Sequence, residues 1–433
     1  MKLLAISFGF PPVVAPRSIQ VARLLQHLDA ETAVICGLPE DEPLDSTIEP
    51  EASLAVARCL RVRHRRSRLR RRLEGLAERA DLPVWNRTPD AYGRWGRAAL
   101  TVARSLLSSG FRPDVLASFG NPMTDHLVGL ELARETGLPW VAHFSDPWTR
   151  NPLHIRSWLD EFLNQRLERL VQRRADVLLF PSSECADHMV AGADPGVQAK
   201  VDVLPHSFRP ESTQAGWPAG GSTGRLVVRH IGELYSRRRL SPVTTALQEI
   251  ASHDPSLLEG VRFEFIGVRD PNSLRGADVN LLPPDVLSLH DRVSYEESVS
   301  LMRSADGLLV LDGAWQGKGI FFPSKLADYI GAGRPIMGIA SPGAGAGIIE
   351  RLGGVVADVS DPAAIALGLR RFLALVRTGS DNRGEAWGNP DERRQYAAPV
   401  VAEQFREQLG RAMAARGHPL GRVGVGVLSS ALT

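Results

Sequence analysis

Cysteine and long apolar runs are scarce in this sequence. Its 433 residues include three cysteines, Cys36, Cys59 and Cys185, with no CxxC or other metal-ligand spacing. An odd number does not suit a disulfide framework, so we expect a reducing, cytoplasmic compartment. No apolar run reaches the about 20 residues that cross a bilayer, so no transmembrane helix is expected. The apolar start, MKLLAISFGFPP, lacks a signal-peptide cleavage site and predicts a first strand.

A large excess of one charge is also missing. Lysine and arginine number 51 and aspartate and glutamate 49, so the net charge is +2, which does not indicate nucleic-acid binding. The composition, 43% hydrophobic and 23% charged, is typical of a globular protein. Because single cores seldom grow beyond about 250–300 residues, the length predicts two domains.

Apolar strands alternate with helical stretches along the chain. Expected strands cover residues 2–8, 33–36, 114–119, 140–144 and 176–182, and expected helices cover 16–29, 96–108, 124–136 and 157–174. A linker rich in Pro, Gly and Ser follows at 209–224. Beyond it, strands are expected at 225–232, 261–267, 292–295, 307–313 and 353–358, and helices at 241–252, 296–304 and 361–376. This alternation predicts parallel sheets covered on both faces.

The predicted architecture is α/β, with two Rossmann-like doubly wound domains facing a central cleft. The first covers residues 1–208 and the second 225–394. Helix 395–414 is long enough to cross back to the first domain, and residues 415–433 form a tail. Ligands of such sheets bind beyond the carboxyl ends of the strands.

The stretch FFPSKLADYIGAGRPIMGIA, residues 321–340, is typical of an anion-binding helix start. Ser324 is the expected N-cap, Lys325 adds a charge in the first turn, and Asp328 lies one turn further on. A helix N-terminus already offers unpaired N–H groups and partial positive charge. A lysine there suggests that an anion compensates, and Asp328 could accept hydrogen bonds from ribose hydroxyls. A solvated lysine and an acid that complements the helix dipole are the alternative.

The stretch RHIGELYSRRRL, residues 229–240, is a second candidate. Gly232 follows a strand and would let backbone approach a ligand closely. Arg237 or Arg238 could clamp a diphosphate with forked donors. A loop with solvated arginines is the alternative.

The first domain carries polar residues after several strands. Gly9 and Arg17 belong to a strand-to-helix turn, His126 stands near a helix start, and Asp146 follows a strand in AHFSDPWTRNP. A structural histidine and a turn-capping aspartate are the alternatives.

Four stretches resemble, in this order, the GT-B-fold glycosyltransferases of family 4, and more narrowly the bacterial members that build surface polysaccharides. They are SFGFPP followed by an arginine, NPMTDHLVGLELARETGLPWVAHFSDPWTRNP, HIGELYSRRRLSPVTTAL and PSKLADYIGAGRPIMGI. The resemblance extends from residue 2 to about residue 410.

The resemblance implies retaining transfer of a sugar from a nucleotide-diphosphate sugar, commonly a UDP-sugar, to an acceptor hydroxyl of a glycan or a lipid-linked molecule. It implies no metal ion and no other cofactor. It implies that Arg237 or Arg238 and Lys325 hold the diphosphate, and that His126 contacts the transferred sugar. Taken with the residues identified above, the candidate catalytic residues are His126, Arg237, Arg238 and Lys325; the donor-binding residues are Gly9, Gly232, Arg292, Val293, Ser324 and Asp328; Arg17 and Asp146 are the candidates on the acceptor side.

Three positions depart from the family pattern. Ile320 stands where the first acid of a paired-acid motif is expected, VVAP replaces a frequent Gly-Gly in the first loop, and Ser145 replaces a frequent arginine. Ile320 leaves open a loss of activity, so a non-catalytic scaffold of the same fold is one alternative to a transferase. A nucleotide-sugar epimerase of the same architecture is another.

The run RCLRVRHRRSRLRRR, Arg58–Arg72, is strongly basic, and leucines at 69, 73 and 76 recur at helical spacing. A basic amphipathic helix is typical of a protein that lies on an anionic membrane surface. This predicts a cytoplasmic protein, peripheral on the inner leaflet of the plasma membrane. Nucleic-acid binding and a solvated loop are the alternatives.

Overall fold

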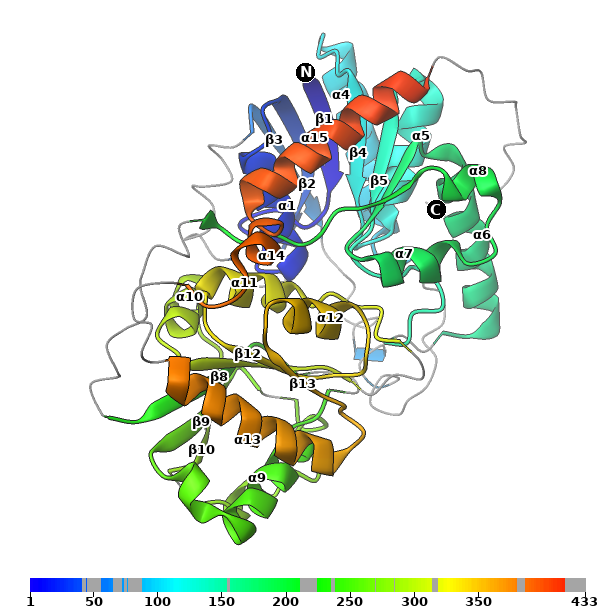
Figure 1. The fold of residues 1–433 in the computed structure, drawn as a ribbon. Helices are drawn as coiled ribbons and strands as arrows, with labels where there is room; N and C mark the ends of the chain where they lie inside the picture. The colour runs from blue at the N-terminus through cyan, green and yellow to red at the C-terminus, as the bar shows by residue number, and fades with distance from the viewer. Residues whose placement is uncertain are drawn as a thin grey trace. The chain divides into compact units, whose positions relative to one another are not determined.

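Two compact units make up the chain. One comprises Met1–Pro205 with the stretch from Val401 onward, and the other comprises His206–Val400. The expected junction lay at residue 208, and most of the expected linker, 211–223, and tail, 417–433, lies outside the described residues. The computed structural model describes residues 1–40, 44, 56–64, 72–73, 76, 88–153, 156–210, 224–234, 238–268, 270–283, 285–313, 318–379 and 386–416 (Figure 1).

The first unit contains a parallel sheet in the order β3-β2-β1-β4-β5-β6-β7. Strand β1 pairs on one side with β2 and on the other with β4, so the chain winds outward in both directions from this point. The crevice beyond the carboxyl ends of β1 and β4 is the usual ligand position of such a sheet. The strands are β1 (Lys2–Ser7), β2 (Glu31–Pro39), β3 (Arg58–His64), β4 (Val115–Phe119), β5 (Trp140–His143), β6 (Val177–Phe180) and β7 (Val201–Val203).

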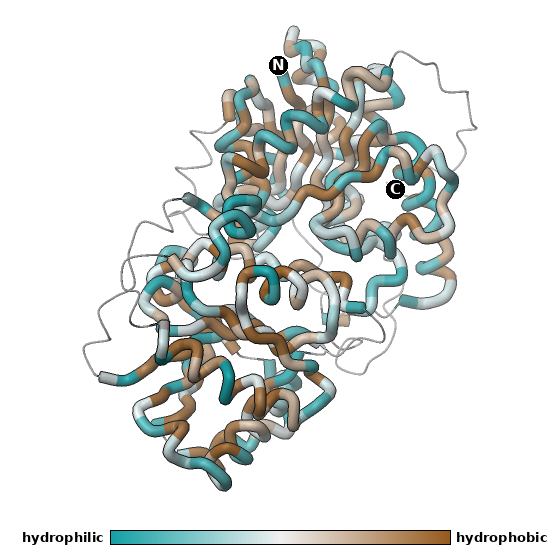
Figure 2. Tube along the Cα trace, in the orientation of Figure 1, coloured by the Kyte–Doolittle hydropathy of each residue, from teal (hydrophilic) through white to brown (hydrophobic). Residues whose placement is uncertain are grey.

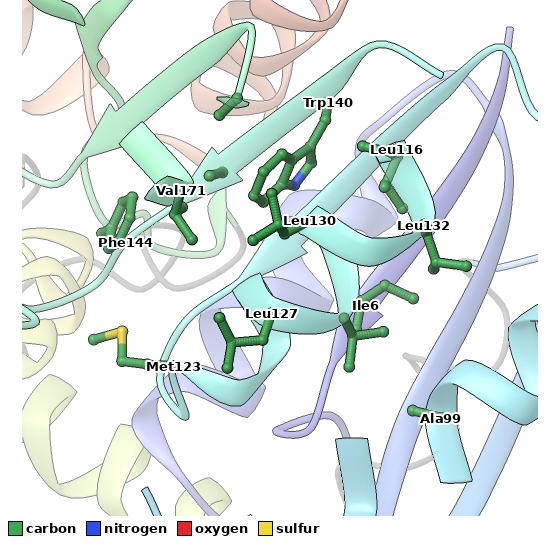
Figure 3. Close-up of a cluster of buried hydrophobic side chains, with 14 of the residues drawn as sticks. Ile6, Ala99, Leu116, Met123, Leu127, Leu130, Leu132, Trp140, Phe144 and Val171 are labelled. Carbon is green, nitrogen blue, oxygen red and sulfur yellow. The ribbon is translucent and has the colours of Figure 1, made fainter. Parts of the chain in front are cut away.

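Helices cover both faces of this sheet and bury two apolar cores. Side chains of α4, α5, α6 and α7 pack on one face, and those of α1 and α15 on the other. Figure 3 shows part of the first core, where Trp140 of β5 and Leu130 of α5 meet; losing such a ring typically costs about 3–5 kcal/mol. The helices are α1 (Pro16–Gln26), α4 (Gly93–Ser108), α5 (Thr124–Thr136), α6 (Trp158–Arg174), α7 (Ser183–Val190), α8 (Pro195–Gln198) and α15 (Ala398–Ala415).

The basic run 58–72 begins as a strand and not as a helix. Residues Arg58–His64 form β3, which pairs with β2 at the edge of the sheet. The exposed Arg61 and Arg63 alternate with the buried Val62 and His64, as the period of a half-buried strand requires. The helical interpretation of residues 58–64 was therefore wrong. Residues 65–71, with Leu69, lie outside the described residues, whereas Leu73 and Leu76 are helical, as their spacing predicted.

The second unit contains a parallel sheet in the order β10-β9-β8-β11-β12-β13. The third strand in sequence is Leu287–His290, so the strand expected at 292–295 was wrong; residues 292–294 connect β10 to the next helix, which begins at Tyr295. The strands are β8 (Leu226–Ile231), β9 (Val261–Ile266), β10 (Leu287–His290), β11 (Gly307–Leu311), β12 (Ile336–Ile339) and β13 (Val355–Ala357).

Helices again cover the two faces of this second sheet. Side chains of α9 and α13 pack on one face, and those of α10, α11 and α12 on the other. The hydropathy colouring follows this layering, with the most hydrophobic stretches along the strands (Figure 2). The helices are α9 (Ser241–His253), η3 (Pro255–Leu258), η4 (Val279–Leu281), α10 (Tyr295–Arg303), α11 (Ser324–Ala332), α12 (Ala344–Arg351), α13 (Pro362–Gly379) and α14 (Pro390–Arg394).

The fold class predicted from the sequence is confirmed: both units are doubly wound α/β structures with parallel sheets. Among the helices that the structure describes, none has both the length and the apolar character needed to span a bilayer.

Candidate functional site

Lys325 and His230 meet at the carboxyl end of β8 in the second unit. Lys325 is the second residue of α11, and its Nζ lies 3.3 Å from His230 Nε2. His230 Nδ1 lies 2.9 Å from the carbonyl oxygen of Leu309. Nε2 also lies 3.2 Å from the carbonyl oxygen of Gly232, so the imidazole is held between two backbone carbonyls and the lysine. The pKa of His230 lies well below its ordinary value through burial and the nearby lysine charge.

Gly232 leaves the space that the lysine side chain occupies. Its φ of +116° belongs to a region that side chains rarely adopt, and a Cβ there would lie 3.1 Å from Lys325 Nζ. Gly267, at the end of β9, also has a positive φ of +84° and packs on Gly232, with Arg292 on its other side. Two glycines at neighbouring strand ends thus expose backbone beside the ammonium group, where a bulkier residue would crowd it.

Arg238 adds a second positive charge to this region. Its Nε donates to Asp312 Oδ1 at 3.0 Å, and both side chains are buried. Asp312 Oδ1 also accepts from the N–H of Gly313, so one carboxylate holds both the arginine and the loop after β11. Loss of hydration, followed by repulsion from Arg238, lowers the pKa of Lys325 to about 7, while Asp312 and Glu233 act in the opposite direction.

The start of α11 carries no side-chain cap. Pro323 occupies the N-cap position and no acid stands in the first turn, so Ser324 is the first helical residue and its expected N-cap role was wrong. Proline suits this position because it supplies no N–H and its φ is fixed. The first-turn N–H groups therefore retain the partial positive charge of a helix start. Further along the helix, Asp328 Oδ1 accepts from the hydroxyl of Tyr295 at 3.4 Å.

In the first unit, Arg17 lies between the carboxyl ends of β1, β4 and β5. The residue is 7% exposed, and one terminal nitrogen donates to the backbone oxygen of His143 at 2.7 Å. Its Nε and second terminal nitrogen have no hydrogen-bond partner among the described residues. Burial lowers the pKa of Arg17 to about 9, opposed chiefly by the carboxylate of Asp146. Gly9 packs against the first turn of α1, where a Cβ would meet Ser18 N at 3.4 Å and Arg17 Cβ at 3.7 Å.

His126 is fully buried in the first unit. It is 0% exposed, its Nδ1 lies 2.8 Å from Ser118 Oγ, and its ring packs on Phe144 with centroids 4.2 Å apart. Burial, and then the charge of Arg17, hold its pKa well below the ordinary value. A Cβ at Gly120 would meet its Nε2 at 2.5 Å, so backbone covers the ring. The catalytic role of His126 stays a prediction that needs a direct test.

The remaining predicted residues fall into two groups. Arg292 is exposed and Val293 packs at the edge of the core beneath α10 and α11, both near the glycine-rich strand ends. Arg237 lies outside the described residues. His230 was not among the residues predicted from the sequence. A signal for it was present, because this histidine lies in an apolar strand two residues before Gly232. Within the part of the chain that the structure describes, no three His, Cys, Asp or Glu residues form a group that could hold a metal ion.

Comparison with known proteins gives a family model and several similar folds. Residues 14–206 match the family model described as a glycosyl transferase 4-like domain. The structure of HepE from Anabaena, in complex with UDP and glucose, covers 95% of this chain and 99% of its own at a TM-score of 0.65 and 14% identity. An E. coli trehalose-6-phosphate protein bound with UDP-2-fluoro glucose covers 94% and 99%, at a TM-score of 0.64 and 13% identity.

A third similar structure is a lipopolysaccharide outer core galactosyltransferase, WaaB, in its apo form. It covers 95% of this chain and 99% of its own at a TM-score of 0.59 and 13% identity. No curated protein matches the sequence closely enough to count as a relative. The fold is that of GT-B glycosyltransferases, and the resemblance predicted from the sequence motifs is confirmed.

Proposed function

We propose that this chain is a metal-independent, retaining glycosyltransferase whose second unit binds the diphosphate of a UDP-sugar. The acceptor that we propose is a hydroxyl of a glycan or a lipid-linked molecule in cell-envelope assembly. The family match and the fold support a glycosyltransferase. Two of the similar structures hold UDP or a UDP-sugar, which supports the choice of donor.

One observation carries the proposal: the environment of Lys325. Its ammonium group meets the neutral His230 and lies near the buried Arg238, so its own charge is unfavourable without a ligand. A diphosphate placed against the start of α11 would supply the missing negative charge. It would restore the protonated form of Lys325, and the uncapped N–H groups of the helix would donate to phosphate oxygens. Exposed backbone at Gly232 leaves room for such an approach.

The chemistry that we propose follows from this electrostatic arrangement. The acceptor oxygen bonds to the anomeric carbon as the bond from that carbon to the phosphate oxygen breaks. The departing phosphate oxygen accepts the proton of the acceptor hydroxyl, so no side-chain base is required. Lys325 stabilises the negative charge that develops on the diphosphate, and the positive charge of Arg238 adds electrostatic attraction without direct contact. Asp328 would accept hydrogen bonds from the ribose, and Arg292 and Val293 would lie near the base.

The first unit would bind the acceptor. Arg17 and Asp146 are the candidate contacts. Arg17 retains guanidinium nitrogens that have no hydrogen-bond partner in the described part of the chain, and Asp146 is partly exposed. Gly9 lets the turn before α1 pack closely against the helix, which is the role that we propose for a glycine loop beside the acceptor. In this proposal His126 contacts the transferred sugar after a small movement of the backbone that covers it.

Binding of UDP, measured by isothermal titration calorimetry at pH 7, tests the donor site. We expect Lys325→Ala to weaken UDP binding by at least tenfold, because a charge-assisted hydrogen bond is worth about 1.5–3 kcal/mol. Lys200→Ala is the matched control, since Lys200 is also partly buried but donates to Arg173 and Ala175 carbonyls in the first unit. Equal UDP affinity in wild type and Lys325→Ala would refute the diphosphate site.

A donor screen with mass-spectrometric detection then tests the reaction. We expect release of a nucleotide diphosphate and a mass increase of one sugar on the acceptor. An isomerised nucleotide sugar without a released nucleotide would identify an epimerase, and UDP binding without any turnover would identify a scaffold. His126→Gln tests the histidine: a lower kcat with unchanged UDP affinity supports the catalytic role, and an unchanged kcat contradicts it.

A further inference from the structure

The solvent-facing side of α6 is unusually apolar in its first two turns. Trp158 is 78% exposed, Phe162 47%, Leu159 42% and Leu163 36%. At spacings of one, four and five residues, these side chains form one continuous stripe on the helix surface. Single exposed apolar residues are normal, but a contiguous group of four large ones marks an interaction site.

The same face becomes basic toward the end of the helix. Arg166, Arg169 and Arg173 are all exposed and continue the stripe at helical spacing. The guanidinium of Arg166 lies over the ring of Phe162, 4.9 Å from its centroid, which joins the apolar half to the basic half. The exposed face of α6 therefore runs from Trp158 to Arg173; we name it the α6 stripe.

The acids of α6 do not neutralise this face. Asp160 and Glu168 are buried, where Asp160 accepts from Ser157 and Glu168 from the backbone N–H of Thr149. Glu161 is half-buried and pairs with Arg156 at 3.5 Å. Each carboxylate on the helix thus has an inward partner. Outside the helix, the exposed Asp194 pairs with Arg173 at 3.3 Å, so Arg166 and Arg169 carry the positive charge of the stripe.

We propose that the α6 stripe docks this protein on a bilayer that contains anionic lipids. Trp, Phe and Leu side chains insert among the acyl chains near the headgroups, and the arginines contact lipid phosphates. Helix α6 has 17 residues, so it is about 25 Å long and lies in the plane of the surface. An apolar half followed by the exposed Arg166 and Arg169, with the carboxylates of α6 itself turned inward, matches an anionic bilayer.

The position of α6 relates docking to the proposed function, on which this part of the inference rests. The loop that carries Asp146 leads directly into α6, and Trp148 Nε1 donates to Asn164 Oδ1 of the helix at 2.7 Å. A lipid-linked acceptor would therefore meet its candidate contacts next to the docked helix. Helix α6 leads into β6, whereas the basic strand β3 lies at the opposite edge of the sheet. The arginines of β3 are therefore not part of the α6 stripe.

Vesicle co-sedimentation of the full chain tests the proposal, with phosphatidylcholine vesicles and with vesicles containing one-quarter phosphatidylglycerol. We expect salt-sensitive binding to the anionic vesicles. Trp158→Ser with Phe162→Ser should reduce the partition coefficient by at least tenfold, and Arg166→Gln with Arg169→Gln by about fivefold per arginine. Leu281→Ser with Leu367→Ser is the matched control, because these leucines are 69% and 55% exposed in the second unit. Circular dichroism checks that each variant folds.

Three results would overturn the proposal. The first is equal binding by wild type and the Trp158/Phe162 variant. The second is loss of binding only in a variant with Arg58, Arg61 and Arg63 changed to Gln, which would assign docking to β3. The third is a wild-type protein that does not bind vesicles but forms a dimer in sedimentation velocity, when the Trp158/Phe162 variant is monomeric. That result would make the stripe an interface between two copies of the chain. UDP calorimetry without vesicles separates the questions: if UDP fails to bind but vesicles do, only the proposed function fails.

Discussion

Proton uptake on nucleotide binding is the sharpest consequence of the Lys325 environment. The pKa of free Lys325 lies at about 7, lowered from an ordinary value of 10.5 by loss of hydration and by Arg238. A bound diphosphate would raise it again, because an opposite charge favours the protonated form. Binding above pH 7 must then take a proton from the buffer.

The size of the effect follows from the two pKa values. At pH 8 a group of pKa 7 is about nine-tenths deprotonated, so binding should take up about 0.9 proton, against about 0.1 at pH 6. Linkage then makes the Kd for UDP rise nearly tenfold per pH unit between about pH 7.5 and 9. The terminal phosphate of UDP titrates near pH 6, so it contributes little in this range.

Calorimetry in buffers of different ionisation enthalpy measures this uptake directly. The slope of the observed enthalpy against buffer enthalpy gives the number of protons bound at each pH. Lys325→Met should abolish the uptake at pH 8 and flatten the pH dependence. An uptake near zero at pH 8 in wild type, or an equal uptake in Lys325→Met, would refute this account of the site.

Three further predictions concern the same side chains and the core. Gly232→Ala should abolish UDP binding, because the new methyl would displace the lysine ammonium, while the free energy of unfolding in urea stays within about 1–2 kcal/mol of wild type; unchanged affinity contradicts this. Asp312→Ala should lower the free energy of unfolding by about 3–5 kcal/mol, since it leaves the buried Arg238 unpaired; a loss below about 1 kcal/mol would show that the arginine finds water instead. Gly129→Ala should cost about 1–3 kcal/mol, because its Cβ would lie 2.7 Å from Trp140 Nε1; chemical denaturation checks this, and a neutral result would mean that the helix shifts freely.

The sequence predicted most of the elements that bury an apolar run. Stretches such as VLASF and VLLF are buried along their whole length, and their hydrophobicity alone indicated central parallel strands. Errors arose where the pattern was ambiguous. Leu287–His290 was missed because its outer half is exposed at the sheet edge, and the apolar RVSY stretch after it attracted the prediction. In Arg58–His64 the arginines concealed the alternation of a strand.

The candidate site was only partly predictable, for reasons of distance along the chain. Lys325 and Gly232 could each be identified from a strand or helix end. Their contact, across 93 residues of sequence, depends on the packing of α11 over β8. His230 was missed because a histidine in an apolar strand is read most simply as a core residue. For His126 the sequence indicated a position near a helix start, and burial depends on the ring packing of Phe144 and on the backbone at Gly120.

Helix α15 makes the first unit discontinuous in sequence. Phe405, Leu409 and Ala412 belong to the same core as the residues of β1, while everything from His206 to Val400 belongs to the other unit (Figure 1). During synthesis the N-terminal half emerges long before the segment that completes its core. It must wait with an apolar face uncovered until nearly the whole chain has left the ribosome, so the second unit can reach its final form first.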